Sequence, residues 1–94
     1  MVRRSRLEIY FDILEVIDRG ITKPTQIMYK TNLSWVTLQD IFDALIKGGF
    51  IREELKKNAK RYEVTDKGRT ALSYYSKSLD GLVHSNQIFM GHLN

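Results

Sequence analysis

The stretch from residue 24 to residue 51 restricts the fold of this chain more than any other part of its sequence. Pro24 suits the first turn of a helix, where the backbone N–H has no partner within the helix. The short helix that it begins carries Ile27 inward and should end near Thr31 and Asn32. A tight polar turn and a longer helix follow. A short helix, a tight turn and a longer helix together predict a helix-turn-helix.

The longer helix has clear signals at both ends. Ser34 stands where an N-cap belongs, so we expect the helix to run from Trp35 to about Lys47. Gly48 and Gly49 should end it, because glycine takes the positive φ that helix ends need. The apolar positions predicted to face the core are Trp35, Leu38, Ile41, Phe42, Leu45 and Ile46. The opposite, mostly polar face consists of Val36, Thr37, Gln39, Asp40, Asp43, Ala44 and Lys47.

Val36 is the one large apolar side chain in the middle of this polar face. It is either an ordinary exposed valine or a contact for a thymine methyl group in a DNA major groove. Thr37 and Gln39 beside it have hydrogen-bonding groups suited to base edges or phosphates. Asp40 would repel phosphates, although a carboxylate can also accept a hydrogen bond from a cytosine amino group.

The first helix should run from about Ser5 to Arg19. Its apolar residues cover more than half of the helix circumference, so we expect it to be buried on two sides. Its polar wedge is mainly acidic, and paired carboxylates can serve catalysis. A solvated face with an ion pair between Glu15 and Arg19 explains the wedge better, because no polar partner accompanies it.

A basic hairpin is predicted directly after the longer helix. The segments FIREEL and KRYEVT alternate as strands do, with Lys57, Asn58 and Ala59 at the turn. The tip carries the cations Lys56, Lys57, Lys60 and Arg61. A basic hairpin after a helix-turn-helix indicates the wing of a winged helix, whose long cationic side chains can reach phosphates. The alternative is a solvated turn without a partner.

The C-terminal part contains a heptad-like seam after the N-cap candidate Thr65. The seam residues are Leu72, Tyr75, Leu79, Leu82, Asn86, Phe89 and Leu93. One interpretation is a helix that pairs with a second copy of the chain. The other is a helix that breaks at Asp80 and Gly81, leaving a short tail packed on the first helix.

Charge and composition narrow the function. The formal net charge of +4 suits a polyanionic partner, and three arginines, Arg3, Arg4 and Arg6, lie in the first six residues. The chain has no cysteine and no catalytic, phosphate-binding or metal-ligating motif, and His84 and His92 lack acidic partners nearby. We therefore expect neither an enzyme nor a metal or cofactor site, and no small-molecule ligand is evident. Without a long apolar run or a signal-peptide pattern, we expect a soluble, cytoplasmic, nucleoid-associated protein with no membrane partner.

The runs RRSRLEIYFDILEVI, KPTQIMYKTNLSW, GGFI and RYEVTDKG, in this order, resemble the small archaeal winged-helix proteins of the 10a type. The match covers roughly residues 3–70. The resemblance implies a winged helix-turn-helix that binds double-stranded DNA and a C-terminal helix that forms an antiparallel coiled-coil homodimer. It also implies that the first turn of the helix after Ser34 faces the groove and that the hairpin around Lys57 and Asn58 is the wing. The chain departs from this pattern in a recognition helix that is less basic than the resemblance implies, with Gln39 and Asp40 where Lys or Arg would suit, and in two glycines within the supposed coil.

The resulting prediction is a mainly α fold with a small β-hairpin. Residues 1–66 form a winged helix-turn-helix domain, and residues 67–94 form a C-terminal dimerisation helix. The expected function is DNA binding by a dimeric transcriptional regulator or chromatin-associated protein; the alternative is a protein-interaction module on the same scaffold. The candidate DNA contacts are Arg3, Arg4, Arg6, Lys30, Ser34, Trp35, Val36, Thr37, Gln39, Asp40, Lys56, Lys57, Asn58, Lys60 and Arg61.

Overall fold

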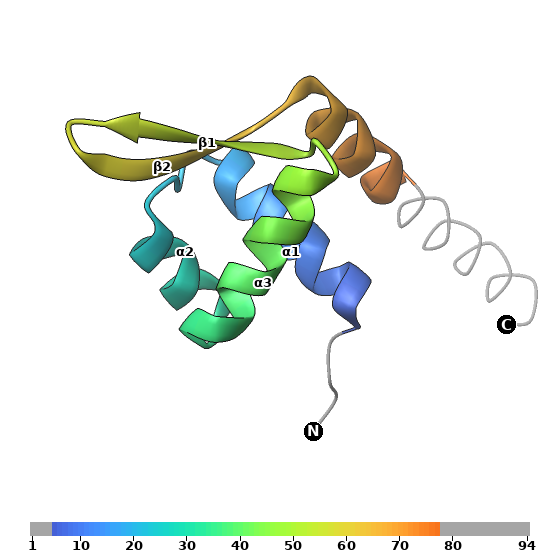
Figure 1. Ribbon diagram of the computed structural model, residues 1–94. Coiled ribbons are helices and arrows are strands. Elements are labelled where there is room, and N and C mark those ends of the chain that lie inside the picture. The colour runs from blue at the N-terminus through green and yellow to red at the C-terminus, as the bar shows by residue number, and fades with distance from the viewer. Residues whose placement is uncertain (1–4, 78–94) are drawn as a thin grey trace, which may run out of the picture.

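The computed structural model describes residues 5–77 (Figure 1). Three helices come first: α1 (Arg6–Asp18), α2 (Pro24–Thr31) and α3 (Trp35–Lys47). The antiparallel strands β1 (Ile51–Lys56) and β2 (Ala59–Val64) follow, and residues 66–77 are again helical. Figure 1 shows the hairpin lying across the helices, with its tip extending past α2. The predicted mainly α fold with one β-hairpin is confirmed.

The turn between α2 and α3 forms as its residue types require. Asn32 takes the left-handed conformation with φ of 56°, and its backbone N–H donates to the carbonyl of Met28. Asparagine tolerates this conformation better than most residues do. Ser34 is the N-cap of α3, and its Oγ accepts the backbone N–H of Thr37 at 3.2 Å. The predicted ends of both helices are confirmed.

One core joins all the elements. Its fully buried apolar side chains are Ile13, Leu14, Ile17, Ile27, Leu38, Ile41, Phe42, Leu45, Ile51, Tyr62 and Val64. The rings of Phe42 and Tyr62 stack with centroids 4.1 Å apart, which fixes β2 against α3. On the other side of α1, the ring of Phe11 stacks on Tyr75 at 3.9 Å. The prediction that α1 is buried on two sides is therefore confirmed.

The prediction that Trp35 and Ile46 belong to the buried stripe of α3 is wrong. Trp35 is 47 % exposed, and Ile46 is also exposed. At 100° per residue, both positions lie roughly a quarter-turn from the centre of the stripe defined by the four buried residues. The buried stripe of α3 is therefore narrower than its set of apolar residues, because no neighbouring element needs to cover an apolar side chain at the edge of the stripe.

The hairpin turn is shorter than the sequence suggested. Only Lys57 and Asn58 form it, with φ of 50° and 63°, and Ala59 opens β2 opposite Lys56. Two successive residues at positive φ make the turn whose twist matches a two-stranded hairpin. Leu55, close to this turn, is 70 % exposed, because the hairpin has by then passed beyond the helices that cover its base.

Thr65 caps the final helix, as predicted. Its Oγ accepts the backbone N–H of Gly68 at 3.1 Å and donates to the carbonyl of Gly49 at 2.5 Å. This links the helix at 66–77 to the glycine turn that ends α3. No helix within residues 5–77 is long and apolar enough to cross a membrane.

Candidate nucleic-acid interface

The first turn of α3 presents an exposed surface at the N-terminal end of a helix. Val36 is 72 % exposed, and Trp35 lies beside it. Asp40 is exposed one turn further on, whereas Thr37 and Gln39 are half-buried. The backbone N–H groups and the positive end of the helix dipole favour an anion at such a terminus. This surface thus offers an apolar group, hydrogen-bonding groups and a weak positive field.

The hydroxyls of Ser34 and Thr37 have different roles. Ser34 Oγ accepts the N–H of Thr37 and donates to Thr37 Oγ1 at 2.9 Å, so the Ser34 hydroxyl is fully used within the cap. Within residues 5–77, the Thr37 hydroxyl has an accepted bond but no acceptor of its own. Thr37 is therefore placed to donate to an outside oxygen or nitrogen, and Ser34 is placed to hold it.

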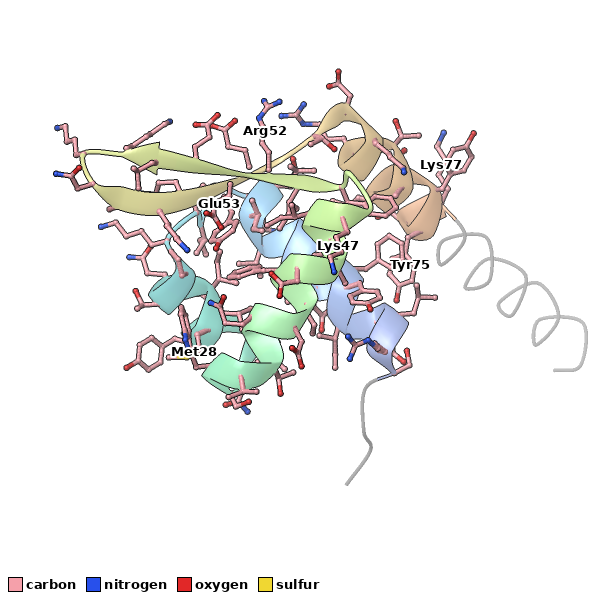
Figure 2. The ribbon with its side chains drawn as sticks, viewed as in Figure 1. Met28, Lys47, Arg52, Glu53, Tyr75 and Lys77 are labelled. Atoms are coloured by element: carbon pink, nitrogen blue, oxygen red, sulfur yellow. The ribbon has the colours of Figure 1, made fainter. Side chains whose placement is uncertain are left out.

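The hairpin has two different faces. Figure 2 shows the labelled side chains of Arg52 and Glu53 leaving β1 in opposite directions. Tyr62, which pairs with Glu53, is 1 % exposed, so this face packs on the helices. The side chains of Arg52, Glu54, Lys56, Arg61 and Glu63 alternate onto the other face, which we call the outer face.

The hairpin cations fall into two groups. Arg52 and Lys56 contact carboxylates on the outer face, and Lys60 lies 3.7 Å from Glu53 on the inner face. In the described part of the chain, Lys57 and Arg61 have no carboxylate partner; Arg61 donates only to the carbonyl of Lys60 at 3.1 Å. The sequence alone does not distinguish the four tip cations, whereas within residues 5–77 only these two of them form no ion pair, although Arg61 stands opposite Glu54 in the ladder.

The cationic candidates outside the hairpin differ in their contacts and exposure. The Arg6 guanidinium donates to the Tyr10 hydroxyl at 2.7 Å and lies 5.3 Å from the centre of its ring. Lys30 is exposed at the end of α2, where it lines an open hollow with Tyr29. Arg3 and Arg4 lie outside the described residues.

Acidic groups flank the space between α3 and the hairpin. The Tyr62 hydroxyl donates to Glu53 at 3.0 Å. Burial raises the pKa of Tyr62 well above its ordinary value, and the nearby carboxylates of Glu53 and Asp43 add to this. Residues 5–77 contain no group of three or more His, Cys, Asp or Glu side chains placed to hold a metal ion.

The first two seam residues pack on their own chain. Leu72 is half-buried against the core, and Tyr75 lies against α1, where it stacks on Phe11 (Figure 2). Part of the apolar face of α1 is thus covered by the same chain. The other seam residues, Leu79, Leu82, Asn86, Phe89 and Leu93, lie outside the described residues.

Sequence reasoning missed three residues at this site, the carboxylates Glu53, Glu54 and Glu63. In the sequence they enter only through the formal net charge. Their positions follow from the register of the hairpin, in which Arg52 pairs with Glu63. A two-residue turn at Lys57 and Asn58, had it been recognised, would have given that register.

Comparison with known proteins gives the family. Residues 3–81 match the family model described as winged helix-turn-helix. An uncharacterised protein of Methanocaldococcus jannaschii is 39 % identical over 71 residues, which cover 76 % of this chain and 69 % of that protein. A second one from the same organism is 35 % identical over 71 residues, which again cover 76 % of this chain but only 32 % of its own length.

Solved structures agree with the fold. Sso10a-2, described as a DNA-binding protein from Sulfolobus solfataricus, superposes with a TM-score of 0.65 and 27 % identity over 97 % of this chain and 98 % of its own. Streptococcus pneumoniae FabT, solved in complex with DNA, superposes with a TM-score of 0.70 and 18 % identity over 88 % of this chain and 64 % of its own. The first match confirms the resemblance to the archaeal 10a-type proteins. The capped helix-turn-helix, the hairpin and the family match lead to one conclusion: this chain belongs to the winged helix-turn-helix family.

Proposed function

We propose that this chain binds double-stranded DNA, with α3 as the recognition helix in the major groove and the hairpin as a wing on the neighbouring backbone. The observation that carries the proposal is the pairing of an exposed first turn of α3 with two hairpin cations, Lys57 and Arg61, that have no carboxylate partner in the described chain. One surface suits base edges, and the other suits phosphates.

Each part of the site has its own role in this proposal. Val36 contacts a thymine methyl group, and Thr37 donates to a base or phosphate acceptor. Trp35 and Gln39 flank them, and Ser34 holds the turn. Asp40 accepts from a cytosine amino group or weakens binding by repelling phosphates.

The electrostatic attraction must come mostly from outside α3. The exposed face of α3 carries Asp40 and Asp43 against Lys47, so it gives no net attraction to a polyanion. Phosphate contacts therefore fall to Lys57 and Arg61, with Lys30, Arg6 and the N-terminal Arg3 and Arg4 as further candidates. Lys56, Lys60 and Asn58 are placed on the wing, but the two lysines must first leave their carboxylates.

We further propose that the chain acts as a homodimer, as a transcriptional regulator or a chromatin-associated protein. The apolar seam that continues past residue 77 supports a dimer, because a single helix would leave that surface in water. Two copies would place two recognition helices on one duplex and so double every contact.

A fluorescence-anisotropy titration of mixed-sequence duplex DNA tests the proposal. We expect binding at about 50 mM salt that weakens steeply at about 200 mM, because cations that neutralise phosphates release counterions. An absence of binding at the lower salt concentration would contradict it.

The second candidate is a protein-interaction module on a winged-helix scaffold. The acidic side chains of Asp40, Asp43 and Glu53, on and beside α3, favour it, because they repel phosphates and suit a basic protein surface. The same titration separates the two functions: a chain that ignores DNA at low salt fits the second one.

A further inference from the structure

Four charged side chains on the outer face of the hairpin form a closed ring of ion pairs. Arg52 lies 3.3 Å from Glu63 and 3.7 Å from Glu54. Lys56 lies 3.6 Å from Glu54 and 3.7 Å from Glu63. Each cation thus contacts both carboxylates, and each carboxylate contacts both cations. We call these four residues the ion-pair ring.

The ring follows from the strand register. Arg52, Glu54 and Lys56 are two residues apart along β1, so they share one face, and Glu63 pairs with Arg52 across the ladder. The carboxylates are more enclosed than the cations, which reach further into solvent. The hydrogen bond from Arg52 lowers the pKa of Glu63, which favours the ionised carboxylate. The ring carries no net charge.

The position of the ring bears on DNA binding. It lies on the same hairpin as Lys57 in the turn and Arg61 on β2, the two hairpin cations without a carboxylate partner in the described chain. A phosphate that approaches the hairpin can contact those two cations without displacing a carboxylate from them. It can gain Arg52 or Lys56 only by displacing two carboxylates from each of them.

We propose that Glu54 and Glu63 set the DNA affinity of the wing by withholding Arg52 and Lys56 from phosphates, an inference that rests on the DNA binding proposed above. Their carboxylates occupy the positions that phosphate oxygens would otherwise take. The wing then releases fewer counterions than its number of cations suggests. Binding depends correspondingly more on α3, which reads the bases.

The test replaces the carboxylates with amides of the same shape. The variants are Glu54→Gln, Glu63→Gln and the double substitution, each titrated with one mixed-sequence duplex over a series of salt concentrations. The control is Glu15→Gln on α1, which also removes one negative charge and frees Arg19 from an ion pair, but on a helix and not on the hairpin.

We expect tighter DNA binding by both single variants than by the control, and the tightest by the double variant. The slope of log K against log salt should steepen by about one for each cation that becomes available. Adding Arg52→Gln and Lys56→Gln should abolish this gain in the double variant, because the ring then has no cation to release. Urea denaturation of each variant separates an effect on phosphate binding from a purely structural role of the two carboxylates. Loss of a structural role would lower stability and leave the salt slope unchanged.

The possible outcomes are distinct. If the wild-type chain binds DNA and the Gln variants match the Glu15→Gln control in affinity and slope, the inference is wrong and the proposed function stands. If only the double variant binds, the ring does restrain binding, but the wild-type function is wrong as proposed. If neither binds, both are overturned.

Discussion

The Tyr62 hydroxyl donates a 3.0 Å hydrogen bond to Glu53, although the Tyr62 ring is buried in the core and stacks on Phe42. One side chain thus connects the core, α3 and the inner face of the hairpin. The stacked rings of Tyr62 and Phe42 join β2 to α3, and Ile51 and Val64 of the hairpin are buried in the same core.

This bond predicts a loss of stability in alkali. Burial raises the folded-state pKa of Tyr62 above the unfolded value of 10.0. The protonated Tyr62 hydroxyl stabilises the folded state fully at pH values below this unfolded-state pKa. Above it, the Tyr62 of the unfolded chain loses its proton first, so the free energy of unfolding falls as pH rises. Urea denaturation should show the free energy of unfolding decreasing between about pH 9 and about pH 11.

Tyr62→Phe is the matched control for this prediction. It keeps the buried ring but loses the hydrogen bond, at a cost of about 1 kcal/mol near neutral pH. Its free energy of unfolding should fall less steeply in alkali than that of the wild type. Equal alkaline slopes for the two proteins would show that other groups cause the loss.

The close packing around Gly68 predicts that alanine at this helical position lowers stability, although alanine has the higher helix propensity. A Cβ at Gly68 would lie 2.1 Å from the carbonyl oxygen of Phe50 and 2.7 Å from Cγ1 of Val64. Alanine normally stabilises a helix interior by about 1 kcal/mol over glycine. Here we expect Gly68→Ala to destabilise the fold by about 1–3 kcal/mol, because backbone must move to make room.

Thermal or urea denaturation measures this change. Gly48→Ala serves as the comparison, because its Cβ would crowd the ring of Phe50 at 2.7 Å, which can rotate away, and would meet backbone only at an ordinary 3.4 Å from the carbonyl oxygen of Ala44. Gly68→Ala should be the more damaging variant. A Gly68→Ala protein as stable as the wild type would mean that the final helix is not held this closely.

Local signals allowed most of the fold to be predicted. The ends of α2 and α3 depend on Pro24, Asn32 and Ser34, whose preferences act within one turn and so can be read from the sequence. The exposure of Trp35 and Leu55 was not predictable in this way, because it depends on how far neighbouring elements reach.

The candidate site was less predictable than the fold. The sequence counted the cations of the hairpin but not their partners, because an ion pair across strands needs the register. Tyr75 was assigned to a dimer seam because heptad spacing does not say whether a helix meets its own chain or a second copy. The structure places it on Phe11 of the same chain.

Because some hairpin cations form ion pairs and others do not, alanine substitutions of these cations should weaken DNA binding to different extents. Lys57→Ala and Arg61→Ala should each weaken binding to all sequences and lower the salt slope by about one. Lys60→Ala should have a smaller effect, because Lys60 is paired with Glu53. Anisotropy titrations over a salt series measure all three, and an unchanged slope for the first two would remove the wing from the interface.

The C-terminal seam predicts a change in assembly. Truncation after Leu79 keeps Leu72 and Tyr75, which pack on the chain's own core, so the remaining chain should stay folded. Analytical ultracentrifugation should give a dimer for the whole chain and a monomer for the truncated one. A truncated chain that still dimerises would place the dimer interface elsewhere.

Trp35 permits the most direct test of the proposed interface. It is the only tryptophan in the chain, it is partly exposed, and it lies in the first turn of α3. Its fluorescence, quenched by acrylamide with and without duplex DNA, reports whether that turn meets DNA. We predict that saturating DNA shields Trp35 from acrylamide, and that the shielding disappears with rising salt in parallel with the anisotropy. Anisotropy that shows DNA bound while Trp35 remains as accessible as in the free protein would contradict the placement of α3 in the groove.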